Sequence, residues 1–553
     1  MRPAEVSAGT PILNVSLLKL PKASAKAAAH TQHNTMGRAS QLLEHLPQQW
    51  QLLLFILPLI SLLFLHRRWK RTGGIRLPPG PWKLPVIGNL HQIGPLPHRS
   101  LSTLARQHGP VMMLRLGTVP TVVLSSPEAA REALKMHDAD CCSRPPAAGP
   151  RLLSYGYKDV AFSPYSDYVR DMRKLFIVEL LSRRRVQAAC YARDTQMGNL
   201  VKNLTNTGRK PVAVADHIFA TLDGIIGSFA FGENYGAEQF KGQFVPVLNE
   251  TMDMLSGFST EDFFPNSVGR LIDKVTGIKS RRERIFKKID AFFEQVIDKC
   301  VGDNPSRRRQ PGDECASVLV QELVDLWKNP AGATNSFTRE HAKAILMNTF
   351  VGGNHTSSVT INWAMAELIR QPRMLGKVQD EIRAIGGKTE LLQHDDMPKL
   401  KYLKMVVKET LRLHPPATLL VPRETTGRIR VAGYDIPAKT KIIVNAWAIG
   451  RDPSVWNDDP KEFRPERFQD KDVDFNGAHF ELLPFGSGRR ICPGLAMGVA
   501  NVEFILANLL YCFNWELPDG VSCEDINMEE AGALTFRKKT PLMLVPTRYS
   551  MCP

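Results

Sequence analysis

One of the nine cysteines, Cys492, stands in a loop whose composition suits close contact with a flat cofactor. The loop, residues 484–494, reads Pro-Phe-Gly-Ser-Gly-Arg-Arg-Ile-Cys-Pro-Gly and runs into an apolar helical stretch from about Leu495 to Tyr511. Its three glycines let the backbone approach a cofactor closely and tolerate the positive φ of a tight loop. At the start of a helix, unpaired N–H groups and the helix dipole favour a thiolate. The pattern predicts a thiolate ligand to a metal, with Arg490 as a cation suited to a carboxylate on the cofactor rim.

A second candidate feature is a pair of glycines inside a long helical pattern. The pattern runs between Thr338 and Pro372 and predicts a helix about 48 Å long, enough to cross a whole domain. Gly352 and Gly353 each cost about 1 kcal/mol relative to alanine, so close approach of a cofactor should offset the loss. The hydroxyl of Thr356 can bond back to the carbonyl of Gly352, which opens a notch for water or O₂. Close crossing by a neighbouring helix is the alternative explanation.

The elements that must position these residues are mostly helices. Long helical patterns dominate the chain after Gly80, and the clearest strands are two short β-branched runs, Thr121–Leu124 and Lys441–Val444. A length of 553 residues alone permits two to four domains, but the sequence shows no internal repeat. We therefore predict one mainly α domain with a small β-sheet region over residues 83–553.

The net charge and the spacing of the cysteines exclude several classes of partner and site. Lys and Arg number 71 against 55 Asp and Glu, a net charge of +16 that suits an anionic partner. Nucleic acid is disfavoured, because the basic residues are scattered and no zinc-finger or ribonucleoprotein signature accompanies them. The cysteines form no C-x-x-C, which argues against a disulfide scaffold and against zinc. We expect a reducing compartment and no nucleic-acid partner.

The N-terminal region predicts a membrane anchor at residues 49–66. This segment holds an almost continuous apolar run that would span about 24 Å as a helix, and the basic residues 66–71 follow at once. Because the basic cluster lies on the C-terminal side, the positive-inside rule leaves the body of the chain in the cytosol. Residues 67–82 are a basic and proline-rich hinge between the anchor and the body.

Residues 1–48 leave two explanations open. They are rich in Ala and Ser and carry five basic side chains against two acidic ones, a composition typical of a plastid transit peptide. They could equally be an upstream extension without function, since translation from Met36 would place the anchor at the usual distance from the start.

Taken together, these motifs resemble the cytochrome P-450 family. The family's haem-binding signature, Phe-x-x-Gly-x-Arg-x-Cys-x-Gly, is matched by Phe485, Gly488, Arg490, Cys492 and Gly494. Two further segments follow in the expected order, a Glu-x-x-Arg at Glu409 and Arg412 and a Pro-Glu-Arg-Phe that includes Arg467. The resemblance implies the cytochrome P-450 fold, haem b with Cys492 as the iron ligand, and a buried charged network that joins Glu409, Arg412 and Arg467.

The resemblance also implies roles for residues outside the signature. Gly352 and Gly353 would form the oxygen-activation groove, in which Thr356 steers protons. Arg173 and Arg423 would bind the two haem propionates.

Two positions depart from the family pattern. Most members carry Asp or Glu immediately before the threonine, where this chain has His355. Histidine titrates near neutrality, so His355 could relay protons, or it could be a neutral side chain in a polar pocket. The second departure is Val169, which stands where the family expects the tryptophan of Trp-x-x-x-Arg.

The resemblance is closest to the plant A-type branch, whose members oxidise specialised metabolites. It implies a substrate pocket lined by the loop before Phe162, the helix around Phe350, Ala417–Val421 and Ala533–Phe536. Most of these residues are apolar, which favours a small lipophilic substrate positioned by shape.

Electrons must come from another protein, because the sequence contains no flavin or dinucleotide fingerprint. The resemblance implies NADPH-cytochrome P-450 reductase as that partner. The predicted function is a haem-thiolate monooxygenase that uses O₂ and sits in the endoplasmic reticulum membrane by a single span, with a plastid as the alternative location. An isomerase or dehydratase on the same haem fold, and a non-catalytic haem-binding protein, are the alternative functions.

Overall fold

The structure, a computed structural model, describes residues 75–232, 247–248, 250–302, 318–329, 337–387, 389–457 and 459–549. The expected anchor at 49–66, the extension at 1–48 and the first part of the hinge at 67–82 lie outside the described residues. From Arg76 onward the chain is one compact unit.

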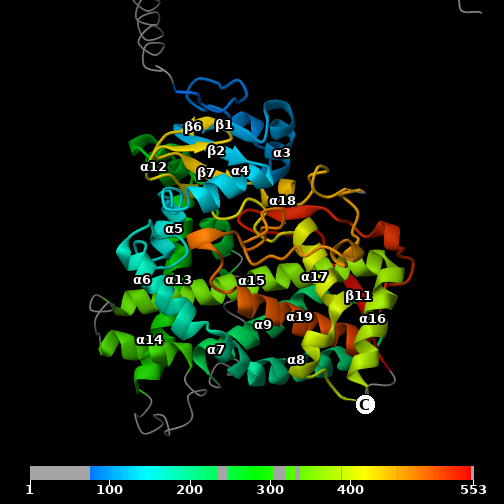
Figure 1. The fold of residues 1–553 in the computed structure, drawn as a ribbon. Helices are drawn as coiled ribbons and strands as arrows, with labels where there is room; N and C mark the ends of the chain where they lie inside the picture. The colour runs from blue at the N-terminus through cyan, green and yellow to red at the C-terminus, as the bar shows by residue number, and fades with distance from the viewer. Residues whose placement is uncertain are drawn as a thin grey trace, which may run out of the picture. The chain divides into compact units, whose positions relative to one another are not determined.

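Helices make up most of this unit (Figure 1). The first ten are α3 (Pro97–His108), α4 (Pro127–Arg131), α5 (Ala148–Leu153), α6 (Asp167–Leu175), α7 (Arg183–Ala188), α8 (Cys190–Asn206), α9 (Val214–Phe231), α11 (Thr260–Phe263), α12 (Ser267–Val275) and α13 (Ile278–Gly302). The others are α14 (Leu319–Lys328), α15 (Arg339–Arg370), α16 (Pro372–Gly386), α17 (Lys401–Leu413), α18 (Ala446–Ile449) and α19 (Leu495–Cys512).

Helix α15 runs through the middle of the molecule (Figure 1). It begins after Thr338, whose hydroxyl and backbone N–H both contact the ring of His341, and ends before Pro372, the first residue of α16. Its 32 residues give a length of about 48 Å, which confirms the predicted helix and its bounds.

The strands form small sheets. Four strands are joined in the order β1 (Val111–Leu116), β2 (Val119–Leu124), β7 (Lys441–Val444) and β4 (Arg423–Glu424). The remaining sheets are β3 (Val212–Ala213) with β11 (Met543–Arg548) and β8 (Phe513–Glu516), the pair β5 (Ile429–Val431) and β6 (Tyr434–Ile436), and the pair β9 (Glu530–Gly532) and β10 (Phe536–Lys538). Both predicted strands are present, in β2 and β7, which pair in parallel.

Two apolar clusters pack on the two halves of α15. Its N-terminal half, with Ile345 and Phe350, packs with α9, α13 and α14, and its C-terminal half, with Ile361 and Leu368, packs with α8, α17 and α19. The middle of α15 therefore lies between the clusters, where a cavity can open.

Two described helices are apolar and long enough to cross a membrane, α9 and α19, but most of each is buried inside this core. Their apolar composition is explained by packing.

Candidate active site

A cavity lies between the middle of α15 and the loop that precedes α19. Cys492 and Gly494 line it from the loop, and Gly352, Gly353 and Thr356 line it from α15. The sequence-predicted catalytic and metal-binding groups, apart from His355, are thus brought to one space.

The walls come from the segments expected to hold the substrate. The lining includes Phe162, Val351, Ala417, Leu420, Val421, Leu534 and Thr535. Phe350 itself is fully buried in the core, and its neighbours on α15 face the cavity in its place.

The Cys492 loop has the tight glycine-dependent geometry that its composition predicts. Gly486 and Gly488 have φ of +70° and +65°, and a Cβ on Gly488 would lie 2.4 Å from the carbonyl oxygen of Leu134. The backbone N–H of Cys492 donates to the carbonyl of Phe485 at 2.9 Å, which closes the loop. Phe485 also lines the cavity.

The electrostatic surroundings of Cys492 contain groups that favour a thiolate and burial that opposes it. Burial raises the pKa of its thiol, and a hydrogen bond from Gly494 and the positive charge of Arg173 oppose that rise only in part. Arg490 instead donates to the carbonyls of Cys142, Val160 and Ser163. Among the described side chains, Arg173 is therefore the cation that favours a thiolate at Cys492.

Four buried arginines face the cavity, and one of them was not predicted. They are Arg144, Arg173, Arg423 and Arg490. Backbone carbonyls hold each one in place, at Ala161, Val421 and Pro422 for Arg144, Ile491 for Arg173, Ser487 for Arg423, and the three already named for Arg490.

This arginine cluster has an excess of positive charge. Among the described residues, Asp138 pairs with Arg423 at 3.2 Å, and Asp159 is the other acidic side chain that acts on Arg144 and Arg490. Burial and then repulsion from other arginines lower the pKa of Arg144, and the same causes lower that of Arg490 to about 10. Carboxylates of a cofactor would balance this excess of positive charge.

The notch predicted in α15 is present. Thr356 donates from Oγ1 to the carbonyl oxygen of Gly352 at 2.7 Å. Although α15 is buried over most of its length, Gly352 is exposed toward the cavity, and a Cβ there would meet nothing within 4 Å. Gly353 has a different reason to be glycine, because a Cβ there would lie 2.9 Å from Cδ1 of Ile226 on α9. The close-helix alternative thus explains Gly353, and open space for a cofactor explains Gly352.

His355 points away from this space. It is 4% exposed, is not among the described residues that line the cavity, and shares a hydrogen bond of 3.0 Å between Nδ1 and Thr535 Oγ1. Burial and then the charge of Arg537 lower its pKa to about 4.

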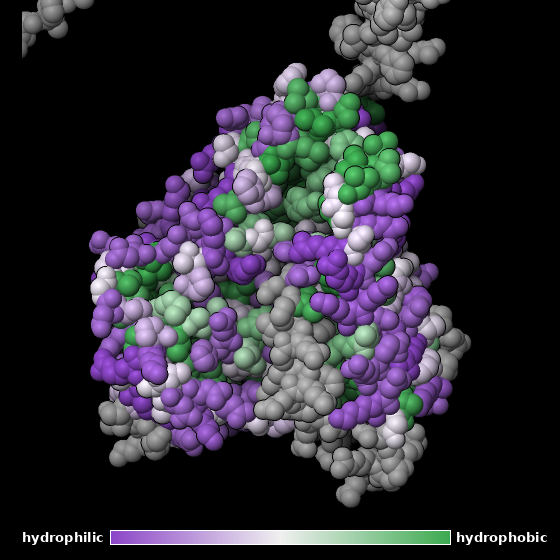
Figure 2. Space-filling view, turned by 180° about the vertical axis from the view of Figure 1, so that it is seen from behind, coloured by the Kyte–Doolittle hydropathy of each residue, from purple (hydrophilic) through white to green (hydrophobic). Residues whose placement is uncertain are grey.

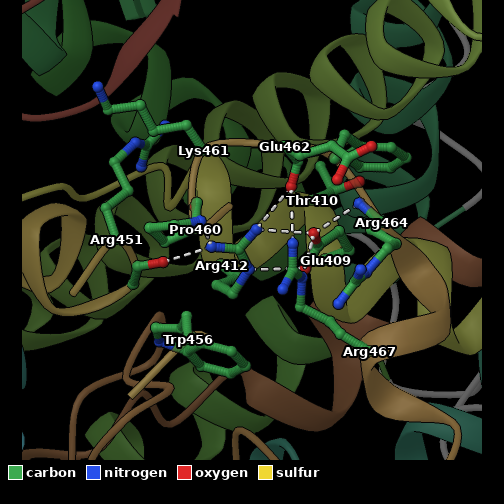
Figure 3. A network of polar contacts seen from close by, with 12 residues as sticks. Glu409, Thr410, Arg412, Arg451, Trp456, Pro460, Lys461, Glu462, Arg464 and Arg467 are labelled. Carbon is green, nitrogen blue, oxygen red and sulfur yellow. Dashed lines mark hydrogen bonds and ion pairs between the residues drawn. The ribbon is translucent and has the colours of Figure 1, made fainter. Parts of the chain in front are cut away.

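The predicted charged network is present behind the site (Figure 3). Arg412 binds both carboxylate oxygens of Glu409, at 2.6 and 2.7 Å, and Arg467 binds Glu409 at 2.9 Å. Both arginines also donate to backbone carbonyls of residues 450–462. Glu409 is fully buried, so the network fixes α17 to the segment that follows α18.

These features fit a haem. Gly352 leaves room for a flat group, Cys492 offers a sulfur ligand from the opposite wall, and the arginine cluster offers sites for two propionates. Val169, at the expected tryptophan position, is buried and contributes no polar group to this cluster.

The sequence model of the cytochrome P450 family matches residues 78–545. The chain belongs to the cytochrome P450 family. A 4-hydroxyphenylacetaldehyde oxime monooxygenase of Sorghum bicolor is 56% identical, covering 91% of this chain and 96% of that protein. A 2-methylbutanal oxime monooxygenase of Manihot esculenta is 46% identical, covering 92% and 99%, and cytochrome P450 71B34 of Arabidopsis thaliana is 46% identical, covering 90% and 98%. A zebra fish cytochrome P450 structure has the same fold, with a TM-score of 0.66 and 22% identity over 83% of this chain and all of that one.

The chain is thus a haem-thiolate P450 monooxygenase of the plant A-type branch that acts on a small lipophilic substrate with O₂ and a reductase as redox partner. This confirms the predicted enzyme class and cofactor. The relatives support neither the isomerase nor the non-catalytic alternative.

Sequence reasoning missed three residues around the P450 cavity: Arg144, Asp159 and Asn348. Asn348 accepts hydrogen bonds from the backbone N–H groups of Val160 and Ala161, and its amide donates to Asp159. Asn348 lies more than 180 residues from these partners in the sequence, and most of the partner atoms are backbone groups. No local sequence motif therefore predicts these contacts.

Proposed function

We propose that this P450 oxidises an aldoxime with an aromatic side chain. The observation that carries the proposal is the 56% identity with the sorghum enzyme over nearly the whole of both chains, together with a second oxime monooxygenase at 46%. The cavity supports it, because its walls include Phe162, Phe229 and Met347, which suit an aromatic ring.

The substrate would be held mainly by shape. The polar side chains nearest these walls are already engaged, since Asn348 binds Asp159 and the backbone of Val160 and Ala161, and Thr349 donates to the carbonyl of Ile345. Each methylene added to or removed from the substrate's side chain should therefore change kcat/KM by about tenfold to 200-fold.

The proposed roles of the site residues follow from their positions. When bound, the haem supplies the chemistry that activates O₂. Cys492 would bind its iron, and the four arginines would hold its propionates and fix its orientation. Phe485, Gly488 and Gly494 would shape the loop on the sulfur side.

On the opposite side, Gly352 and Gly353 would form the groove for O₂. Thr356 would hold a proton at Oγ1, at a position that its bond to Gly352 defines. The apolar walls would exclude bulk water, so protons reach the site only through such fixed groups.

The test uses the full chain in microsomes with NADPH-cytochrome P450 reductase. We expect consumption of 4-hydroxyphenylacetaldehyde oxime that depends on NADPH and O₂, with one atom of ¹⁸O₂ in the product and the other in water. 2-Methylbutanal oxime should be a poorer substrate. If neither oxime is consumed by enzyme that shows the red-shifted CO spectrum of thiolate ligation, the oxime assignment is wrong.

We also propose that residues 49–66 anchor the enzyme in the endoplasmic reticulum membrane, with the catalytic domain from residue 83 in the cytosol and the reductase on the same membrane. Exposed apolar side chains support this: Trp82, Val86, Val268, Leu271 and Val275. These side chains lie in two segments, residues 82–86 and 268–275. The turn at Gly117 and Thr118 connects the two regions, because Gly117 donates its N–H to the carbonyl of Ile87 and Thr118 donates its N–H to the carbonyl of Phe263. Figure 2 shows apolar residues gathered on the upper part of the back face.

The location of fluorescent fusions in the cell distinguishes the endoplasmic reticulum from the plastid. A fluorescent fusion that begins at Met36 should label the endoplasmic reticulum, and one that begins at Met1 tests residues 1–48. Import of the Met1 fusion into plastids would establish that these residues are a transit peptide.

A further inference from the structure

The turn of the β9–β10 hairpin forms part of the wall of the substrate cavity. Leu534 and Thr535 line the cavity from this turn. Gly532 has φ of +151°, and a Cβ there would lie 1.9 Å from the carbonyl oxygen of Thr535. The turn is therefore tight, and its shape depends on what holds it.

Hydrogen bonds from outside the hairpin hold the turn and the first residue of β10, and two of them come from α15. Phe536 donates its N–H to the carbonyl of Pro416 at 3.0 Å and accepts from Trp363 Nε1 at 3.0 Å. The third bond is the one between Thr535 Oγ1 and His355 Nδ1, also 3.0 Å. His355 and Trp363 lie about two turns apart on α15, so they hold the hairpin at two points.

His355 is badly placed to move protons to the cavity. Its side chain is buried, and successive residues on a helix point about 100° apart, so Thr356 faces the cavity while His355 faces the hairpin. Burial and then the charge of Arg537 lower its pKa to about 4, so the ring is neutral at cellular pH.

We propose that His355 is a positioning residue that fixes the turn at Leu534 and Thr535, and thereby the shape of the substrate cavity, and that it is not a proton relay. The inference rests on the proposed assignment of this cavity as the substrate site. It explains why a histidine is compatible with activity at a position where most family members have an acid.

The hydrogen bond between His355 and Thr535 also sets the polarity of the cavity wall. With its hydroxyl engaged by His355, Thr535 leaves its methyl group as the part free to meet an apolar ligand. Without His355 the hydroxyl is free to turn, and the wall becomes both more mobile and more polar.

Matched substitutions separate positioning from proton relay. His355→Asn places a non-titrating polar atom near the position of Nδ1, so it keeps a bond to Thr535 but cannot relay protons. His355→Leu removes the bond at similar volume. On the partner side, Thr535→Ser keeps the hydroxyl and Thr535→Val removes it.

Two readouts on the holoenzyme need no turnover. The first is the affinity for 4-phenylimidazole, measured from the optical shift on binding. The second is hydrogen–deuterium exchange of residues 530–538. We expect H355L and T535V each to weaken azole binding about threefold to tenfold, the effect of losing one hydrogen bond, and to speed exchange. H355N and T535S should resemble the parent, and the H355L/T535V double variant should be no worse than either single variant.

Turnover of the oxime supplies the third readout. Under the proposal, H355N keeps the parent ratio of product to NADPH consumed, whereas H355L changes the product distribution. A loss of coupling in H355N with unchanged azole affinity would overturn the proposal in favour of a proton relay. Unchanged azole affinity and exchange in H355L would overturn it as well. If the parent enzyme consumes no oxime but the azole and exchange pattern holds, only the substrate assignment fails.

Discussion

Asn348 on α15 donates a hydrogen bond to the carboxylate of Asp159 at 3.1 Å, and this contact joins the substrate side of the cavity to its cofactor side. The same carboxylate accepts from the N–H groups of Ala161 and Phe162 and from the hydroxyl of Ser163. The loop so ordered presents Phe162 to the cavity and carbonyls 160, 161 and 163 to Arg144 and Arg490.

We therefore expect Asp159→Asn to weaken haem retention and ligand binding together. Burial raises the pKa of Asp159, against hydrogen bonds from Phe162, Asn348 and Ser163 that favour its ionised form. The substitution removes this carboxylate from the neighbourhood of Arg144 and Arg490, and one lost charge-assisted contact costs about 1–3 kcal/mol. Transfer of haem to an acceptor protein and the Kd for 4-phenylimidazole measure the two effects. Asp167→Asn, at an exposed aspartate of α6, is the control and should leave both unchanged.

The network behind the site leads to a second prediction. Glu409→Gln leaves the buried guanidinium groups of Arg412 and Arg467 without their shared carboxylate, which should cost about 3–5 kcal/mol of stability. The thermal unfolding midpoint and the fraction of protein with the red-shifted CO band should both fall. Glu466→Gln, which breaks a half-exposed pair with Lys377, provides the comparison. Equal losses in the two variants would contradict the network's proposed role.

The two adjacent glycines of α15 should respond differently to alanine. In Gly352→Ala the new Cβ enters open cavity, so the cofactor-free protein should gain about 1 kcal/mol from helix propensity while haem retention falls. In Gly353→Ala the new Cβ presses on Cδ1 of Ile226, so overpacking of about 1–3 kcal/mol opposes the same gain in helix propensity, and the variant should be less stable than G352A without haem. The thermal unfolding midpoints of the two variants and the parent, each with and without haem, measure these changes in stability. Loss of stability in cofactor-free G352A would show that the cavity side of α15 is not open.

Glu503 on α19 makes stability depend on pH. Burial raises its pKa to about 7, against the opposing charges of Lys404 and Lys408 and with a contribution from Asp474. The folded state therefore holds a proton that the unfolded state has released, and stability falls as pH rises from about 4.5 to 7. Glu503→Gln should remove this loss, by an amount on the order of 1–3 kcal/mol above pH 7. Unfolding midpoints of the two proteins should coincide near pH 4 and separate toward pH 8.

The sequence allowed prediction of those parts of the fold that depend on local pattern. The bounds of α15, strands β2 and β7 and the tight Cys492 loop follow from periodicity, β-branching and glycine spacing, and all are present. The cavity-lining segments were also predicted, but only through the family resemblance.

Long-range contacts to backbone groups could not be predicted in this way. Arg144 reaches carbonyls at Val421 and Pro422, more than 270 residues away, and nothing in its neighbours indicates that. The sequence likewise does not show that Arg490 donates to three carbonyls or that Arg173 is a cation that acts on Cys492. His355 looked like a candidate proton carrier because sequence shows its neighbour, Thr356, but not the direction in which each side chain points.

The arginine cluster should make the stability of the fold depend on its cofactor. Backbone carbonyls hold these buried side chains close together, so their like charges repel one another unless anionic groups lie among them. Ligand that binds only the native state shifts the folding equilibrium by mass action. The amount of mature enzyme in a cell should therefore follow the rate of porphyrin synthesis, and chains made in excess of it should be degraded.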